Sequence, residues 1–137
     1  MNSSRFKIGT FLDVIQGSNK LDEKQKAWIL GQFTSHPTSE EMDDIYFTYI
    51  KPALIKAYEK HPINMPTLND GIEVVHEEVD ELIEVARSQN IDRIELIKEG
   101  THAAAMMHRL FHDVLIPLSR YIKKQEEAEK NAATPAE

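Results

Sequence analysis

The chain has 137 residues, of which 41% are hydrophobic and 28% charged, and its formal net charge is −7. This length is typical of one domain, and the composition is that of a folded chain rather than of a disordered or fibrous one. The absence of cysteine excludes disulfides, zinc–thiolate sites, iron–sulfur clusters and cysteine nucleophiles.

The charge balance also bears on the partners. Asp and Glu number 23 against 16 Lys and Arg, which disfavours a nucleic-acid polymer because its phosphates would be repelled. A nucleoside triphosphate stays compatible, since a divalent cation can join carboxylates to phosphates. No run approaches the ~20 apolar residues of a membrane span, and no signal peptide is expected at the start. We therefore expect a cytoplasmic protein without a membrane partner.

Helical periodicity dominates the sequence and predicts an all-α fold. A first clear helix is expected over about 21–33. Thr38 is a predicted N-cap, with Glu41 completing a capping box. The helix that follows should end or kink before Pro52, because proline lacks the amide hydrogen and clashes with the preceding turn. A further helical piece is expected to run to about residue 60.

An antiparallel helical hairpin is predicted over about 67–122, with its turn at Gln89–Asn90. Its second helix is apolar around nearly its whole circumference over 103–118, which is typical of a buried helix. Pro117 should kink that helix near its end. We expect a single helical domain over 1–124, followed by a disordered tail over 125–137.

The first helix of this hairpin is strongly acidic, with Glu73, Glu77, Glu78, Asp80, Glu81 and Glu84 and no Lys or Arg between them. Such a run often marks only a solvated helix face. If the hairpin turns at Asn90, however, Glu78 faces His102 and Glu81 faces Glu99. Facing carboxylates repel each other unless a cation neutralises them. The hairpin is therefore a candidate divalent-metal site.

These same residues carry a resemblance to a known family. Residues 77–82 read Glu-Glu-Val-Asp-Glu-Leu and resemble the EExxEL motif of the MazG-like all-α nucleoside triphosphate pyrophosphohydrolases. The family's second element, ExxD on the next helix, corresponds to Glu99-Gly100-Thr101-His102, so His102 stands where the family has a carboxylate. Small residues and methionines after it, and the segment 58–62, resemble the phage-type subgroup. The resemblance covers about 55–118.

The resemblance implies a metal-dependent hydrolase that cleaves a nucleoside triphosphate to the monophosphate and pyrophosphate. It implies that Mg²⁺ or Mn²⁺ is held by Glu78, Glu81, Glu99 and His102, with Glu77 and Glu78 as catalytic residues. It also implies a homodimer or homotetramer. By charge alone, Lys60, Lys98 and Arg109 are candidate phosphate contacts, and Trp28, Tyr46 and Tyr58 are aromatic candidates for stacking on a base.

Two other interpretations remain open. The chain could be a catalytically inactive MazG-like module that binds a nucleotide or a partner, since fold does not fix function. It could also be a di-metal carboxylate bundle, because residues 73–76 and 99–102 are both Glu-x-x-His units. In a hairpin that turns at Asn90, these units are offset by about 5 residues, or ~7.5 Å along the axis, so they do not share a level.

Overall fold

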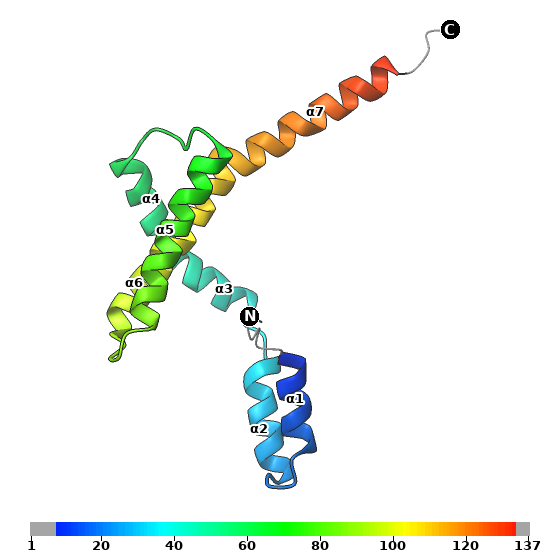
Figure 1. Cartoon of the computed structure of the whole chain (residues 1–137), viewed down its shortest axis with the longest axis vertical. Helices are drawn as coiled ribbons and strands as arrows, with labels where there is room; N and C mark the ends of the chain where they lie inside the picture. Colours follow the sequence, from blue (N-terminus) through cyan, green and yellow to red (C-terminus); the bar gives the residue numbers. More distant parts are fainter. Residues whose placement is uncertain (1–7, 134–137) are drawn as a thin grey trace, which may run out of the picture. The chain divides into compact units, whose positions relative to one another are not determined.

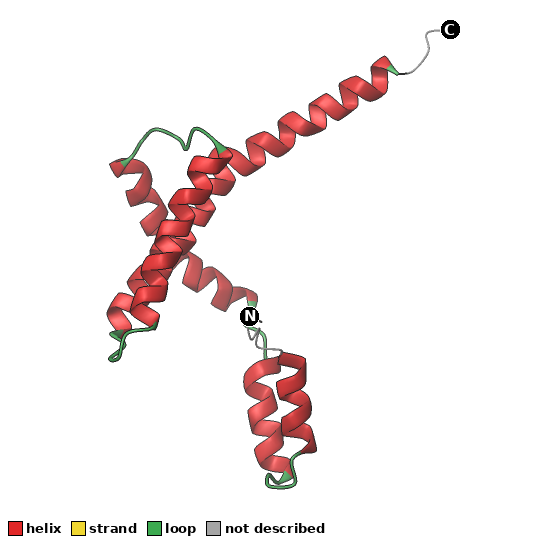
Figure 2. Ribbon diagram, in the orientation of Figure 1, coloured by secondary structure: helices red, strands yellow, loops and turns green. Residues whose placement is uncertain are grey.

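The computed structural model describes residues 8–133, and over these residues the chain is helical, with turns and loops and no strand (Figure 2). The all-α prediction is confirmed. The chain divides into two compact units, residues 1–41 and 42–137. The domain bounds expected from the sequence, 1–124, stay a prediction. A non-helical segment, residues 35–38, lies near the division. No helix in the described part is long and apolar enough to cross a membrane.

The first unit contains a hairpin of α1 (Ile8–Gly17) and α2 (Glu23–Thr34), shown in blue and cyan in Figure 1. Asp22 caps α2 by accepting a hydrogen bond from the Gln25 amide at 2.8 Å, while the Gln25 side chain accepts one from the Asp22 amide. The rings of Phe11 and Phe33 meet edge to face with centroids 5.0 Å apart. Helix α2 lies where the sequence predicts a helix.

The second unit begins within α3 (Ser39–Ile45), whose predicted capping box is present. The Glu41 amide donates to the Thr38 hydroxyl at 3.1 Å, and the Thr38 amide donates to the Glu41 carboxylate at 3.0 Å. The chain then continues through a π-helical turn, η1 (Tyr46–Ile50), into α4 (Lys51–Lys60).

A π-helical turn precedes each of the two prolines at which a kink is predicted. The π-helical turn η1 leads into α4, whose first turn contains Pro52. A second π-helical turn, η2 (Phe111–Leu115), leads into α7 (Ile116–Ala132), whose first turn contains Pro117. A π-helical turn bonds each amide to the carbonyl five residues earlier. This widening relieves the ring's clash with the preceding turn, so the helical segment continues through the proline without ending.

Helices α5 (Leu68–Ala86) and α6 (Arg93–Leu110) run antiparallel side by side, and α4 packs on α6 (Figure 1). Thr67 caps α5 by accepting from the Asp70 amide, and Asp92 caps α6 by accepting from the amides of Ile94 and Glu95. The buried hydrophobic side chains of the described residues all belong to this second unit: Leu54, Ala105, Leu110 and Val114.

Two expectations about the last helices differ from the structure. Within 103–118 only part of the circumference is buried, and Met107 and Phe111 are 39% and 45% exposed, because the other helices of the unit cover only one side. The tail expected over 125–137 is helical as far as Ala132. Its Lys, Gln, Glu and Ala residues are strong helix formers, and the remaining residues, 134–137, lie outside the described part.

Candidate metal centre

The α5–α6 hairpin brings together three side chains that could hold a metal ion. Glu78 on α5 faces Glu99 and His102, which are three residues apart and so lie on one face of α6. One ligand atom from each of the three lies within 4.8 Å of the others. We call these residues the Glu–Glu–His cluster. The predicted facing of Glu78 and His102 is present.

Each carboxylate of this cluster has one buried oxygen without a hydrogen-bond donor. Glu78 Oε2 and Glu99 Oε2 are both buried and make no hydrogen bond. The Glu99 side chain is only 12% exposed, and its Oε2 lies 3.8 Å from His102 Nδ1, which is too far for a hydrogen bond. Buried polar atoms normally have partners, and a buried charge without one is costly. A bound cation would satisfy both oxygens.

The pKa of the Glu78 carboxyl is raised in this setting. Burial raises it most, and the negative charges of Glu81 and Glu99 raise it further, while His102 lowers it. The same features that raise this pKa would favour a divalent cation, because the ion would replace the proton as the neutralising charge.

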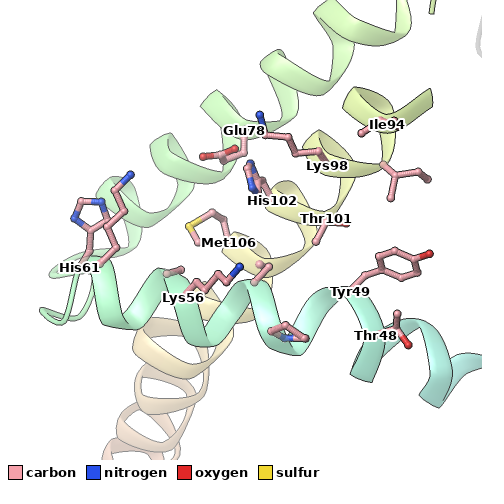
Figure 3. A pocket seen from close by; sticks show the side chains of 16 residues that line it. Thr48, Tyr49, Lys56, His61, Glu78, Ile94, Lys98, Thr101, His102 and Met106 are labelled. Carbon is pink, nitrogen blue, oxygen red and sulfur yellow. The ribbon is translucent and has the colours of Figure 1, made fainter. Parts of the chain in front are cut away.

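The cluster opens onto a pocket of about 540 Å³ between α4 and α6. Figure 3 shows Glu78, His102 and Lys98 close together on one side of the pocket, and Lys56 and Tyr49 on the α4 and η1 side. Three lysines, Lys56, Lys60 and Lys98, line the pocket. The pocket therefore combines a cation-binding cluster with positive side chains that suit an anion.

The other predicted acidic residues lie outside the three-residue group. Glu81 is exposed, although it is near enough to Glu78 to raise the pKa of that carboxyl. Glu77 is exposed and does not line the pocket. The first Glu-x-x-His unit does not join the cluster: His76 instead pairs with Asp80 at 3.2 Å on the surface of α5.

Two of the three predicted phosphate contacts line the pocket. Lys60 does so from the end of α4, and Lys98 does so from α6, where its ammonium also lies 3.7 Å from Glu95. Sequence reasoning missed Lys56, which is one helical turn before Lys60 on α4. The spacing of four residues could have indicated it.

Arg109, the third predicted phosphate contact, is 4% exposed and has a different role. Its guanidinium donates to the carbonyls of Ala57, His61 and Ile63 and, through Nε, to Asp113 at 3.2 Å. These contacts use its donors within the fold, so Arg109 does not face the pocket as a free cation.

Asp113 completes this second group of polar side chains. It accepts hydrogen bonds from the Tyr58 hydroxyl at 2.6 Å and the Met65 amide at 2.9 Å, and the Arg109 guanidinium stacks on the Tyr58 ring. We call Tyr58, Arg109 and Asp113 the Arg109 network. It fastens the loop after α4 to the end of α6.

The predicted aromatic candidates do not line the pocket. Tyr58 belongs to the Arg109 network, Tyr46 packs against the His108 ring, and Trp28 lies in the first unit. Tyr49 lines the pocket instead and is 47% exposed. The sequence contained no signal separating Tyr49 from Tyr46, because the π-helical turn changes the face on which each residue of this segment lies.

No protein-family model, no curated protein and no solved structure matches the chain.

Proposed function

We propose that the second unit is a divalent-metal-dependent nucleoside triphosphate pyrophosphohydrolase. The observation that carries the proposal is the pair of buried, unpartnered oxygens of Glu78 and Glu99 beside His102. They border a pocket with three lysines. A site for a metal–triphosphate complex needs both elements, a cation ligand set and positive groups for the phosphate oxygens.

Glu78, Glu99 and His102 are the proposed ligands for Mg²⁺ or Mn²⁺, with Glu81 beside them as a further carboxylate. When bound, the ion supplies charge neutralisation of the triphosphate and a water of lowered pKa. Lys56, Lys60 and Lys98 bind the phosphate oxygens. The net reaction adds one water across the α–β phosphoanhydride bond and gives a nucleoside monophosphate and pyrophosphate.

Tyr49 is the proposed contact for the base. Its ring lines the same pocket and is half exposed, so it is free to stack on a planar group. The pocket volume of about 540 Å³ suits a ligand of nucleotide size.

A second copy of the chain is the proposed partner of the apolar face left open on this unit. Met107 and Phe111 are 39% and 45% exposed and lie four residues apart, so they share one helix face. Leu118, on the other side of η2, is 37% exposed. An apolar surface of this kind is typical of an interface. Sedimentation equilibrium should therefore give a dimer or tetramer, and a monomer at every concentration would contradict this part of the proposal.

The deciding experiment measures pyrophosphate release from a panel of canonical and damaged ribo- and deoxyribonucleoside triphosphates with Mg²⁺ or Mn²⁺. Glu78→Gln should reduce release to background, because it removes one ligand charge. Glu73→Gln is the matched control: it makes the same change at an exposed position of α5 outside the pocket, and release should persist. Absence of release with every nucleotide and metal would favour a binding module without turnover.

A further inference from the structure

The ligand set of the Glu–Glu–His cluster is unusual for a magnesium site. Mg²⁺ is a hard ion that binds oxygen ligands and waters in near-ideal octahedral geometry. Imidazole nitrogen instead suits first-row transition metals. Mn²⁺ is the weakest binder of that series and otherwise prefers oxygen ligands, as Mg²⁺ does, so an imidazole ligand favours Mn²⁺ only relative to Mg²⁺. One of the three converging side chains here is an imidazole.

We infer that the cluster binds Mn²⁺ in preference to Mg²⁺, and that the imidazole nitrogen of His102 sets this preference. The inference rests on the metal site of the proposed function. It concerns the identity of the ion alone, and its test needs no nucleotide.

The geometry supports His102 as a ligand rather than a bystander. Two donors bonded to one ion at about 2.1 Å lie roughly 3.0 Å apart when adjacent and 4.2 Å apart when opposite. The 3.8 Å between His102 Nδ1 and Glu99 Oε2 lies between these two values, so the two side chains would shift slightly on binding. The full group spreads to 4.8 Å, so a small side-chain movement would bring all three donors onto one ion.

The partial burial of the cluster also bears on which ion it binds. Glu99 is 12% exposed and His102 is 44% exposed, so an ion between them is partly withdrawn from water. Mg²⁺ gives up its bound waters reluctantly. A partly dry site with a nitrogen donor should therefore disfavour Mg²⁺ on two separate grounds.

The first test uses the wild-type protein and Mn²⁺ as the probe. Electron spin-echo modulation of bound Mn²⁺ should show coupling to an imidazole nitrogen. The variant His76→Gln, which removes an exposed imidazole elsewhere on α5, should leave the coupling unchanged. Mn²⁺ bound without nitrogen coupling, or no Mn²⁺ binding at all, would overturn the inference.

The second test compares affinities. Free Mn²⁺ is measured from its electron paramagnetic resonance signal, and Mg²⁺ is added as a competitor. His102→Asp should lower the ratio of Mn²⁺ to Mg²⁺ affinity by about tenfold, since it replaces the nitrogen with a carboxylate. A ratio unchanged by this substitution would overturn the inference. Selective Mn²⁺ binding without pyrophosphate release would leave the inference standing and remove the proposed reaction.

Discussion

Two polar clusters of the second unit bury carboxylates in opposite ways. In the Arg109 network, both oxygens of Asp113 accept hydrogen bonds. In the Glu–Glu–His cluster, one oxygen from each glutamate is buried without any. The first arrangement is complete within the chain, whereas the second leaves one buried oxygen of each glutamate without a hydrogen-bond donor. The comparison separates a polar group that holds the fold together from one that is arranged to bind something.

The pKa values of the two clusters follow the same division. Burial alone would raise the pKa of Asp113, but hydrogen bonds from Tyr58, Met65 and Arg109 outweigh burial, and this pKa is lowered. The pKa of Glu78 is raised, first by burial and then by the charge of Glu81. Ionisation is favoured where donors are present and opposed where they are absent.

The largest expected effect comes from breaking the complete cluster. Arg109→Met should destabilise the second unit by about 3–5 kcal/mol, the usual cost of leaving a buried charge unpaired. It also removes the donors to the carbonyls of Ala57, His61 and Ile63. Urea unfolding followed by circular dichroism measures the loss.

The double variant Arg109→Met with Asp113→Asn is the control for this prediction. It should regain part of the lost stability, because the Asp113 carboxylate, which the single variant leaves buried without its cation, is replaced by a neutral amide. A loss smaller than about 1 kcal/mol in the single variant would mean that Arg109 contributes no more than an exposed ion pair.

The second effect tests the packing beside each cluster. A Cβ added at Gly71 would overlap the Leu110 side chain and lie 3.1 Å from Met65 Sδ, next to the Arg109 network. Gly71→Ala should cost about 1–3 kcal/mol, as overpacking usually does. Gly100→Ala is the matched control beside Glu99, where the new Cβ would lie 4.0 Å from Leu82.

At Gly100 the opposite sign is expected. Alanine in a helix interior is favoured over glycine by about 0.5–1 kcal/mol, so this variant should be more stable than the wild type in the same urea experiment. Equal losses at Gly71 and Gly100 would contradict the different spacing of the helices at the two positions.

Several features of the fold can be predicted from capping residues and helix periodicity alone. The capping box of Thr38 and Glu41 lies where residue type and spacing predict it. The facing of Glu78 and His102 followed from helix period and turn position alone. Each of these features depends on residues near in sequence or on one regular hairpin.

The features that sequence reasoning missed depend on contacts between distant segments. Arg109 has the charge of a phosphate ligand, and only the return of the 57–63 segment to α6 shows that its donors are used. Tyr49 lies in a π-helical turn and lines the pocket for that reason, and α-helical periodicity does not predict such a turn. The end of α7, expected to be disordered, is helical as far as Ala132. Its residue types are compatible with either state, because charged residues and alanine occur both in disordered tails and in exposed helices.

A smaller effect is expected from neutralising the incomplete cluster. In chelator at pH 7.5, Glu78→Gln should stabilise the second unit by about 1 kcal/mol, because partial burial and the charges of Glu81 and Glu99 disfavour the ionised carboxylate. Asp113→Asn, the equivalent change in the Arg109 network, should destabilise it. Thermal unfolding with excess Mn²⁺ should then reverse the order for Glu78→Gln, since only the wild type gains from the metal. Destabilisation by Glu78→Gln in chelator would mean that its carboxylate already has a partner.

The smallest effect concerns the phenol of the Arg109 network and its pH dependence. Burial, together with the hydrogen bond that Tyr58 donates to Asp113, raises the pKa of Tyr58 from 10.0 to about 12. A raised pKa means that the folded state holds the proton more tightly than the unfolded state. The resulting stability is therefore fully present below pH 10 and is lost as the pH rises through about 12. The difference between the tyrosinate absorbance titrations of wild type and Tyr58→Phe isolates this phenol, while circular dichroism reports whether the helices persist. A titration midpoint near 10 for Tyr58, with the helices intact, would show that the hydrogen bond to Asp113 does not retain the phenol proton. It would contradict the description of the Arg109 network as a complete set of hydrogen bonds.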